Sequence, residues 1–378
     1  MMKKVLLGAM VVALVVIGAF EGRGSNSELL DFVPRNSSVL FFINLEDFFQ
    51  SQAVQGVRDE NIEVEAAMQD LEKKLAPFQV TPDQLCRQVL IGANVANMNV
   101  AALFLTDLPE DKCKDVLNAM QADESGRTVS EMETNGRKVF VSTVNPNDPA
   151  ELANAPALTY VTPNIVLATQ YSQVGAVLSG LGKVLPRDRE VLEVAEDMPQ
   201  EALFFFVLKT PSGAQREAMP PNPLFNMVDL LQLYGKLTGD NGRDVELDST
   251  IYCRDLRGSS TLATQLQASA AMITTMVFSD EPDLGRQLLE CIKISRDRED
   301  VTVKVKVPEA LGSEVADYIA YKGTQMQKNG ENPLQMMPLP GLAPAENAGE
   351  ATVTVEGDGT GEMKLEDLLN EIPVQDAQ

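Results

Sequence analysis

PRNSSVLFFINL, residues 34–45, decides the fold of this chain. A proline and several small or polar residues lead into an unbroken apolar run, which predicts a β-strand buried on both faces. A second copy of the pattern, PQEALFFFVL, occupies residues 199–208. The recurrence of an opening strand indicates an internal repeat.

Further landmarks follow both opening strands in the same order. Each half continues with a Cys-Arg pair, a second strand, a proline at a helix start, and a helix. In the first half these predict a strand over residues 99–106 and a helix over 110–120. In the second half they predict a strand over 261–278 and a helix over 283–294.

Two other segments carry strong local signals. Apolar residues at helical spacing predict an amphipathic helix over residues 64–78, and the corresponding helix of the second half is expected over 225–237. Asn135-Gly136 predicts the turn of a β-hairpin.

These elements predict an α+β protein. We expect two related units, residues 25–183 and 190–325, each an antiparallel sheet with helices on one face. The seam between the units is the expected surface for a ligand or partner. Residues 326–378 are of low complexity and acidic, which predicts a flexible C-terminal tail.

The N-terminus predicts export. Lys3 and Lys4 precede an uncharged apolar run over residues 5–20, so residues 1–20 are expected to be a signal peptide or an N-terminal anchor. The run is shorter than the roughly 20 residues that span a bilayer, which favours cleavage, but the site after Ala19 is a poor one. Both alternatives place the rest of the chain outside the cytoplasm, in the periplasm or at the cell surface. Both confine membrane contact to the N-terminal segment.

Composition excludes several functions. The chain has 31 Lys and Arg against 55 Asp and Glu, a formal charge of −24, so it would repel nucleic acid phosphates. It contains no histidine, which removes Ser-His-Asp and Cys-His catalysis and histidine metal ligation. Carboxylate pairs and a Ser-Lys pair remain possible.

Four cysteines in an exported chain, two per half, favour disulfides. The order along the sequence suggests the pairs Cys86–Cys113 and Cys253–Cys291. The alternative is four buried reduced thiols, because cysteine is a common small core residue.

A Gly-rich segment of the tail can be aligned with a calcium-binding loop, although it departs from the usual pattern at the first and last positions and lacks a preceding helix. Calcium is therefore the cofactor to test, and a simple Gly-rich hairpin turn is the alternative. The five oxygen-bearing candidates are Glu356, Asp358, Thr360, Glu362 and Asp367.

The proline-led opening strand, the segment TPDQL at residues 81–85 before VLIG at 89–92, and the Asp-x-Pro helix start give a resemblance. The chain resembles uncharacterised exported bacterial proteins with a duplicated α+β domain of unknown function. The resemblance implies an extracytoplasmic location and offers no catalytic residue.

We therefore expect a non-enzymatic binding or envelope-structural protein whose partner is an envelope protein or a small ligand. The alternative is an extracytoplasmic hydrolase that uses carboxylates or a Ser-Lys pair. The sequence contains no G-x-S-x-G motif, P-loop or dinucleotide fingerprint.

Overall fold

The computed structural model describes residues 27–50, 62–94, 99–121, 126–184, 189–211, 213, 226–238 and 243–329. The predicted leader and the predicted calcium loop lie outside these residues. The chain divides into two compact units, residues 1–322 and 323–378, and the sheet belongs to the first. Within the described part of the chain, the membrane-span criteria of length and apolarity are met by no helix.

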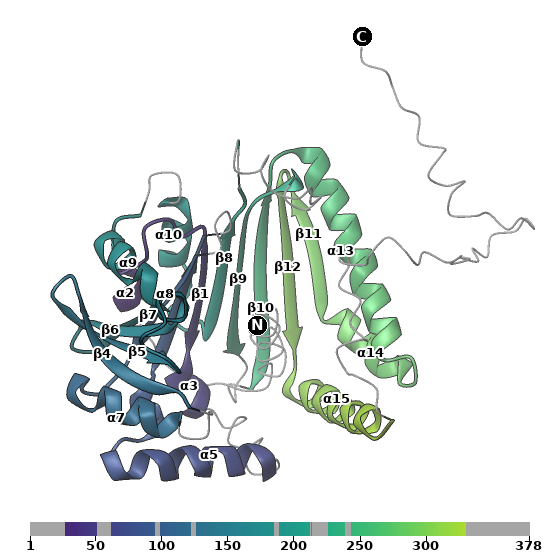
Figure 1. The fold of residues 1–378 in the computed structure, drawn as a ribbon. Helices are drawn as coiled ribbons and strands as arrows, with labels where there is room; N and C mark the ends of the chain where they lie inside the picture. Colours follow the sequence, from purple (N-terminus) through teal and green to yellow (C-terminus); the bar gives the residue numbers. More distant parts are fainter. Residues whose placement is uncertain are drawn as a thin grey trace, which may run out of the picture. The chain divides into compact units, whose positions relative to one another are not determined.

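The described strands form one twelve-stranded sheet in the order β11-β12-β10-β9-β8-β1-β2-β3-β7-β6-β5-β4 (Figure 1). Every neighbouring pair is antiparallel, so the predicted α+β class with antiparallel strands is confirmed. The strands are β1 (Val39–Asn44), β2 (Gln88–Ala93), β3 (Val100–Leu105), β4 (Thr128–Thr134), β5 (Arg137–Thr143), β6 (Pro156–Thr162), β7 (Ile165–Gln170), β8 (Phe204–Lys209), β9 (Val228–Thr238), β10 (Asp244–Cys253), β11 (Ile292–Asp297) and β12 (Asp300–Val307).

Helices connect these strands and cover the sheet. The predicted amphipathic helix and the helix after β3 are confirmed as α5 and α7. The α-helices are α2 (Ser27–Leu30), α3 (Leu45–Gln50), α5 (Ile62–Leu75), α6 (Pro82–Leu85), α7 (Glu110–Met120), α8 (Pro149–Asn154), α9 (Val174–Gly180), α10 (Arg189–Glu196), α13 (Leu256–Val277), α14 (Pro282–Glu290) and α15 (Glu309–Asn329).

In the first half, helices lie on both faces of the sheet. Successive residues of a strand point to opposite faces. Leu103 and Leu105 of β3 pack with apolar residues of α2 and α10, whereas Phe104 between them packs with α5 and α7. The expectation of helices on one face is therefore wrong for this half, because central strands that are apolar on both sides need cover on both sides.

In the second half, α13, α14 and α15 lie on one face of the sheet, whereas α10 packs on Phe205 and Val207 of β8 on the other face, so the expectation of helices on one face is wrong here too. Val245 and Ile251 of β10 and Val301 and Val307 of β12 all point to the same side of the sheet, as the alternation of strand residues requires. They pack with apolar residues of α13, α14 and α15.

The strands β1 and β8 join the two halves. Phe41 lies opposite Phe206 in this antiparallel pair. Phe206 follows Phe41 by 165 residues, the same interval that separates Pro34 from Pro199 in the two opening patterns. A local twofold axis at this pair therefore relates the repeated sequence patterns in space.

The strand order on either side of this axis follows one plan. Each half begins with a three-stranded meander, β1-β2-β3 or β8-β9-β10, and continues through helix to a hairpin whose last strand returns to the third strand. The returning hairpins are β6–β7 and β11–β12, and the first half adds the extra hairpin β4–β5. The seam is thus a hydrogen-bonded pair of central strands.

The predicted helix over residues 225–237 is wrong, because β9 occupies Val228–Thr238. The apolar residues of this segment fit either period, and hydrogen bonding to both β8 and β10 decides for the strand. Gly235 serves this packing. A Cβ at Gly235 would lie 2.3 Å from Cε1 of Phe204, so the ring needs a glycine beneath it.

The predicted strand over residues 261–278 is also wrong, because α13 spans Leu256–Val277. The Asp255 carboxylate caps this helix by accepting a hydrogen bond from the Gly258 amide at 2.6 Å. Leu262 and Leu266, one turn apart, pack on the sheet. The remaining Ala, Gln and Met residues favour helix over strand.

Candidate functional site

The ladder between β5 and β6 is interrupted. These strands form only two register pairs, Phe140 with Leu158 and Val141 with Ala157. Beyond them, side chains replace ladder bonds. The hydroxyl of Thr159 donates to the Lys138 carbonyl at 2.8 Å.

Arg137, the first residue of β5, closes the gap. Its Nη1 donates to the Tyr160 carbonyl at 2.7 Å and to the Val161 carbonyl at 3.1 Å. The cause lies in β6, whose pairing with β7 is irregular between Tyr160 and Thr162. A bulge of this kind bends a strand away from its neighbour.

The connection from β3 to α7 forms the facing wall. The buried hydroxyl of Thr106 donates to the Gln84 carbonyl at 3.0 Å and accepts from the Leu108 amide at 3.0 Å. The phenol of Tyr160 donates to the Leu108 carbonyl at 2.7 Å, which fixes β6 to this connection. Both walls are therefore held by hydrogen bonds before any ligand arrives.

These walls border an open cavity of about 630 Å³. It is lined by residues 106–110, by Arg137 and by residues 160–164 at the β6–β7 turn. Its size is within the range typical of small-molecule sites. Of the charged lining groups, Asp107 forms an ion pair with Arg87 at 3.3 Å, and Glu110 is exposed in the first turn of α7.

The titratable groups behind the wall are unreactive. Burial raises the pKa of the Cys113 thiol to about 11, against the opposing effect of its hydrogen bond with Tyr160. Burial, with the nearby Cys113 and Glu110, also raises the pKa of Tyr160. Neither group ionises near neutral pH, so neither can act as a nucleophile or a general base.

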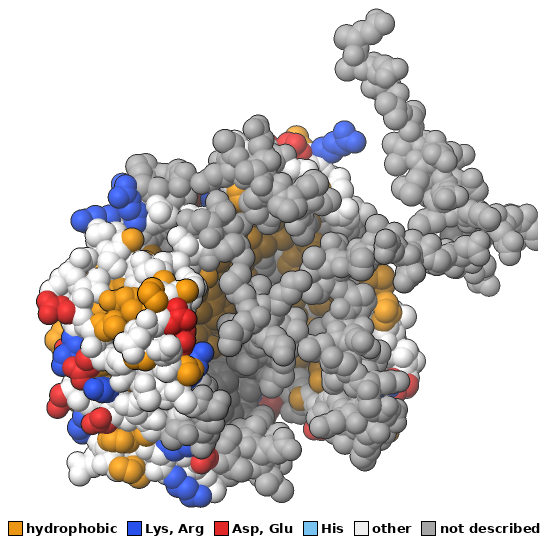
Figure 2. All heavy atoms as spheres, viewed as in Figure 1, with side chains coloured by type: hydrophobic (Ala, Val, Ile, Leu, Met, Phe, Trp, Pro, Cys, Tyr) orange, Lys and Arg blue, Asp and Glu red, His pale blue; other side chains and the backbone are white. Residues whose placement is uncertain are grey.

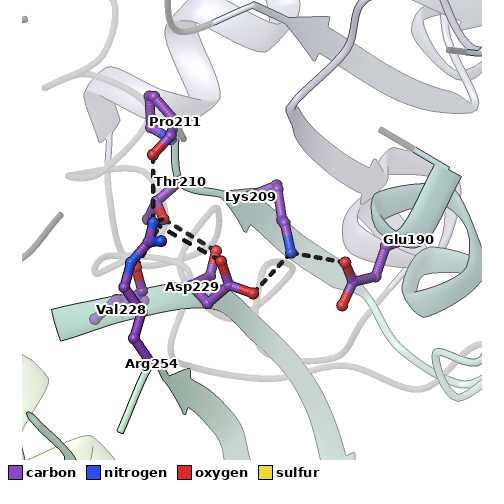
Figure 3. A network of polar contacts seen from close by, with 7 residues as sticks. All are labelled: Glu190, Lys209, Thr210, Pro211, Val228, Asp229 and Arg254. Carbon is purple, nitrogen blue, oxygen red and sulfur yellow. Dashed lines mark hydrogen bonds and ion pairs between the residues drawn. The ribbon is translucent and has the colours of Figure 1, made fainter. Parts of the chain in front are cut away.

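A second polar cluster lies where β8, β9 and β10 meet α10 (Figure 3). Lys209 Nζ contacts Glu190 Oε2 at 2.7 Å and Asp229 Oδ2 at 2.8 Å. Arg254 Nη2 donates to the Thr210 hydroxyl at 2.9 Å and lies 3.8 Å from Asp229 Oδ1. The two positive and two negative charges of this cluster balance. Its ion pairs and hydrogen bonds connect the strands with α10.

Lysine chemistry is disfavoured by the same contacts. Burial alone would lower the pKa of Lys209, but the bonds to Asp229 and Glu190 outweigh burial and raise it. Hydrogen bonds to Asp248 and Asp280 likewise raise the pKa of Lys304 and Lys322. A catalytic lysine needs a lowered pKa, so these three do not suit a Ser-Lys mechanism.

All four cysteines are free thiols in the structure, so neither predicted bridge is formed. The Cys253 amide donates to the Glu299 carbonyl, and the Cys291 carbonyl accepts from the Lys306 amide, which places the two cysteines toward opposite ends of β12. Seven residues of strand separate these points by about 23 Å, and a disulfide needs Cα atoms within about 7 Å. The structure therefore does not bring this pair together.

Cys86 and Cys113 have separate partners. The Cys86 thiol donates to the Gln88 carbonyl at 3.5 Å, whereas Cys113 bonds with Tyr160. The predicted calcium ligands lie outside the described residues. Groups of three or more acidic or cysteine side chains able to hold a metal are absent from the part of the chain that the structure describes.

The sequence signals did not reveal the cavity. Arg137 follows the predicted Asn135-Gly136 turn directly, and both turn residues have positive φ, as that hairpin requires. The hairpin was therefore predictable, but the pairing of β6 that turns Arg137 toward its carbonyls is a long-range feature. Tyr160 likewise resembled an ordinary strand residue.

Charged groups are mixed on the visible surface. In the view of Figure 2, basic and acidic side chains are interspersed over the first half of the sheet and its helices, among the residues that are coloured. This half therefore presents no broad basic face in that view.

No family model matches the sequence, and no curated protein matches it. Three solved structures of a protein named TP0453 are distantly similar. Crystal form III has a TM-score of 0.39 and 11% identity, and covers 76% of this chain and 97% of that chain. Form IV has a TM-score of 0.38, 11% identity and coverage of 76% and 96%. Form I has a TM-score of 0.37, 10% identity and coverage of 77% and 97%. Similarity at this level supports no inference about function.

Proposed function

We propose that this chain is an exported, non-enzymatic binding protein of the cell envelope, and that the cavity between the β3–α7 connection and the β6–β7 turn is its ligand site. The leader over residues 1–20 supports the location, either as a cleaved signal peptide or as an anchor. The observation that carries the binding role is a cavity of about 630 Å³ with walls already fixed by Arg137, Thr106 and Tyr160.

The chemistry of the wall favours binding over catalysis. Burial holds the thiol of Cys113 and the phenol of Tyr160 in their protonated forms. A site of pre-positioned hydrogen-bonding groups binds without a large ordering cost, because its side chains are already immobile.

The alternative, a hydrolase with a carboxylate base, has one observation in its favour. Burial, assisted by Glu46, raises the pKa of Asp47 to about 6, a value that suits a general base. However, the Asp47 carboxylate accepts a hydrogen bond from the Asn44 amide at 2.6 Å at the start of α3. It does not line the cavity. A capping role at the helix N-terminus explains the contact.

The location is tested by a reporter enzyme fused to the C-terminus of the full chain. Activity of a reporter that folds only outside the cytoplasm is expected, and a reporter active only in the cytosol would contradict export.

The site is tested with the exported protein by ligand-observed NMR against small acids, amines, sugars and peptides. Glu110→Trp places bulk at the cavity wall, and Asp111→Trp places the same bulk one residue away, outside it. We expect binding that is lost with the first variant and kept with the second. Compounds that bind both variants as well as they bind the wild type, or compounds that are chemically changed by the protein, would contradict a binding role for this cavity.

A further inference from the structure

Only one of the two terminal nitrogens of the Arg137 guanidinium donates hydrogen bonds to the protein. Both of its hydrogen bonds leave through Nη1, to the carbonyls of Tyr160 and Val161. Its Nε–H and Nη2 groups have no partner among the residues that the structure describes. These two groups form the edge of a guanidinium that binds a carboxylate side-on with two parallel hydrogen bonds.

Arg137 is exposed and has no ion pair with a carboxylate among the described residues. With 55 acidic side chains against 31 basic ones, carboxylate partners are abundant, and Arg87 and Arg254 both lie near one. Arg137 instead donates through Nη1 to two backbone carbonyls, which fixes the plane of the guanidinium. Its remaining edge belongs to a residue that lines the cavity.

The remaining wall limits what can bind there. Leu108, Val161, Pro109 and Pro163 give the cavity an apolar lining. Pro109 is the N-cap of α7 and offers no side-chain cap, so the positive end of this helix also favours an anion. Glu110 at the rim repels negative charge, and it repels a doubly charged group more strongly than a singly charged one.

We propose that the cavity recognises a monocarboxylate with an apolar body, such as the C-terminus of a peptide that ends in an apolar residue, through the Nε–Nη2 edge of Arg137. The inference rests on the proposed function and names the ligand class of that same site. The ligand carboxylate would accept hydrogen bonds from the Nε–Nη2 edge of Arg137, and the apolar part of the ligand would pack on the apolar lining. Glu110 disfavours doubly charged phosphates.

The test uses matched probes on the exported protein: N-acetyl-leucine, its amide, and phenyl phosphate, each titrated by calorimetry or NMR. We expect the acid to bind and the amide and phosphate to bind at least about tenfold more weakly, since a hydrogen bond to a charged group contributes about 1.5–3 kcal/mol. Arg137→Gln should weaken the acid by a similar factor and leave the amide unchanged.

Two further variants separate recognition from structure. Arg137→Lys keeps a donor for the Tyr160 and Val161 carbonyls but loses the fork, so we expect an intact fold with weakened acid binding. Arg296→Gln removes an exposed arginine at the far edge strand β11 and should change nothing.

The outcomes distinguish this inference from the proposed function. Equal affinity for the acid and the amide, or for the acid and the phosphate, would overturn the carboxylate inference and leave the cavity a binding site. An Arg137→Gln variant that folds and binds the acid normally would do the same. Failure of the acid to bind at millimolar concentration would also overturn the inference, whereas the binding role itself fails when the cavity-blocking variant affects no ligand or when compounds emerge chemically changed.

Discussion

The rings of Phe42 and Phe205 stack at the centre of the sheet, with centroids 5.0 Å apart and planes 15° from parallel. Both side chains are fully buried. They face each other across β1 and β8, the strands that join the two halves of the chain. A single ring pair therefore contributes to the stability of both halves.

Phe205→Ala should lower the free energy of unfolding by about 3–5 kcal/mol, the usual cost of removing a buried phenylalanine. Because the ring lies between the halves, we expect one cooperative transition that moves as a whole to lower temperature. Calorimetry and circular dichroism of the exported protein measure both quantities.

Phe205→Leu is the matched control, because it keeps most of the volume and should cost less than about 1.5 kcal/mol. Two separate transitions, of which Phe205→Ala shifts only one, would show that the halves unfold independently. That result would contradict the coupling through β1 and β8.

The thiols give a second prediction. The exported protein, denatured without reductant and alkylated, should carry four adducts, one for each of its free cysteines. In the native state, alkylation at pH 8 should be slow, because burial raises the pKa of Cys86 to about 12 and that of Cys113 to about 11. Fewer than four adducts, counted by mass spectrometry, would reveal a bridge that this structure does not contain.

Local signals predicted the elements that local physics controls. The apolar runs at 39–43 and 204–208 predict strands, and both are strands, with one face buried and the other half-buried. Asn135-Gly136 specifies a tight hairpin. The interval between the two prolines equals the interval between Phe41 and Phe206, which pair across β1 and β8. Such features need no knowledge of the remainder of the chain.

The predictions from sequence are wrong where the structure is determined by pairing with residues distant in the chain. Residues 228–238 have apolar spacing that suits helix or strand, and two flanking strands make the choice. The uncharged residues of α13 do not by themselves exclude a strand, and the cap at Asp255 marks the start of a helix. Arg137 could not be recognised, because its role depends on a break in the ladder between β5 and β6.

Asp47 gives a prediction about pH. Burial raises its pKa to about 6 from an ordinary 3.8, so the folded protein holds this proton more tightly than the unfolded chain does. Stability from this group is therefore present below about pH 4 and is lost as the pH rises through 6. Asp47→Asn keeps an oxygen for the Asn44 amide and removes the charge.

We expect Asp47→Asn to match the wild type near pH 4 and to exceed its stability by about 1–2 kcal/mol above pH 6. Denaturant unfolding across this range measures the difference. Asp317→Asn, on an exposed face of α15, is the control and should show no such pH-dependent gain. A gain that is equal at pH 4 and pH 7 would contradict a role for the Asp47 proton.

Two glycines should respond in opposite directions to the same substitution. Gly235→Ala brings a Cβ within 2.3 Å of Cε1 and 2.6 Å of Cζ of Phe204, and within 3.0 Å of Leu247. The ring is held by β8 and its neighbours, so we expect a loss of about 1–3 kcal/mol from overpacking. Gly312→Ala in α15 meets only Val307 at 3.8 Å, an ordinary contact, and should gain about 0.5–1 kcal/mol because alanine favours helix. Thermal unfolding of both variants measures the signs, and a Gly235→Ala variant as stable as the wild type would show that Phe204 can leave the surface of β9.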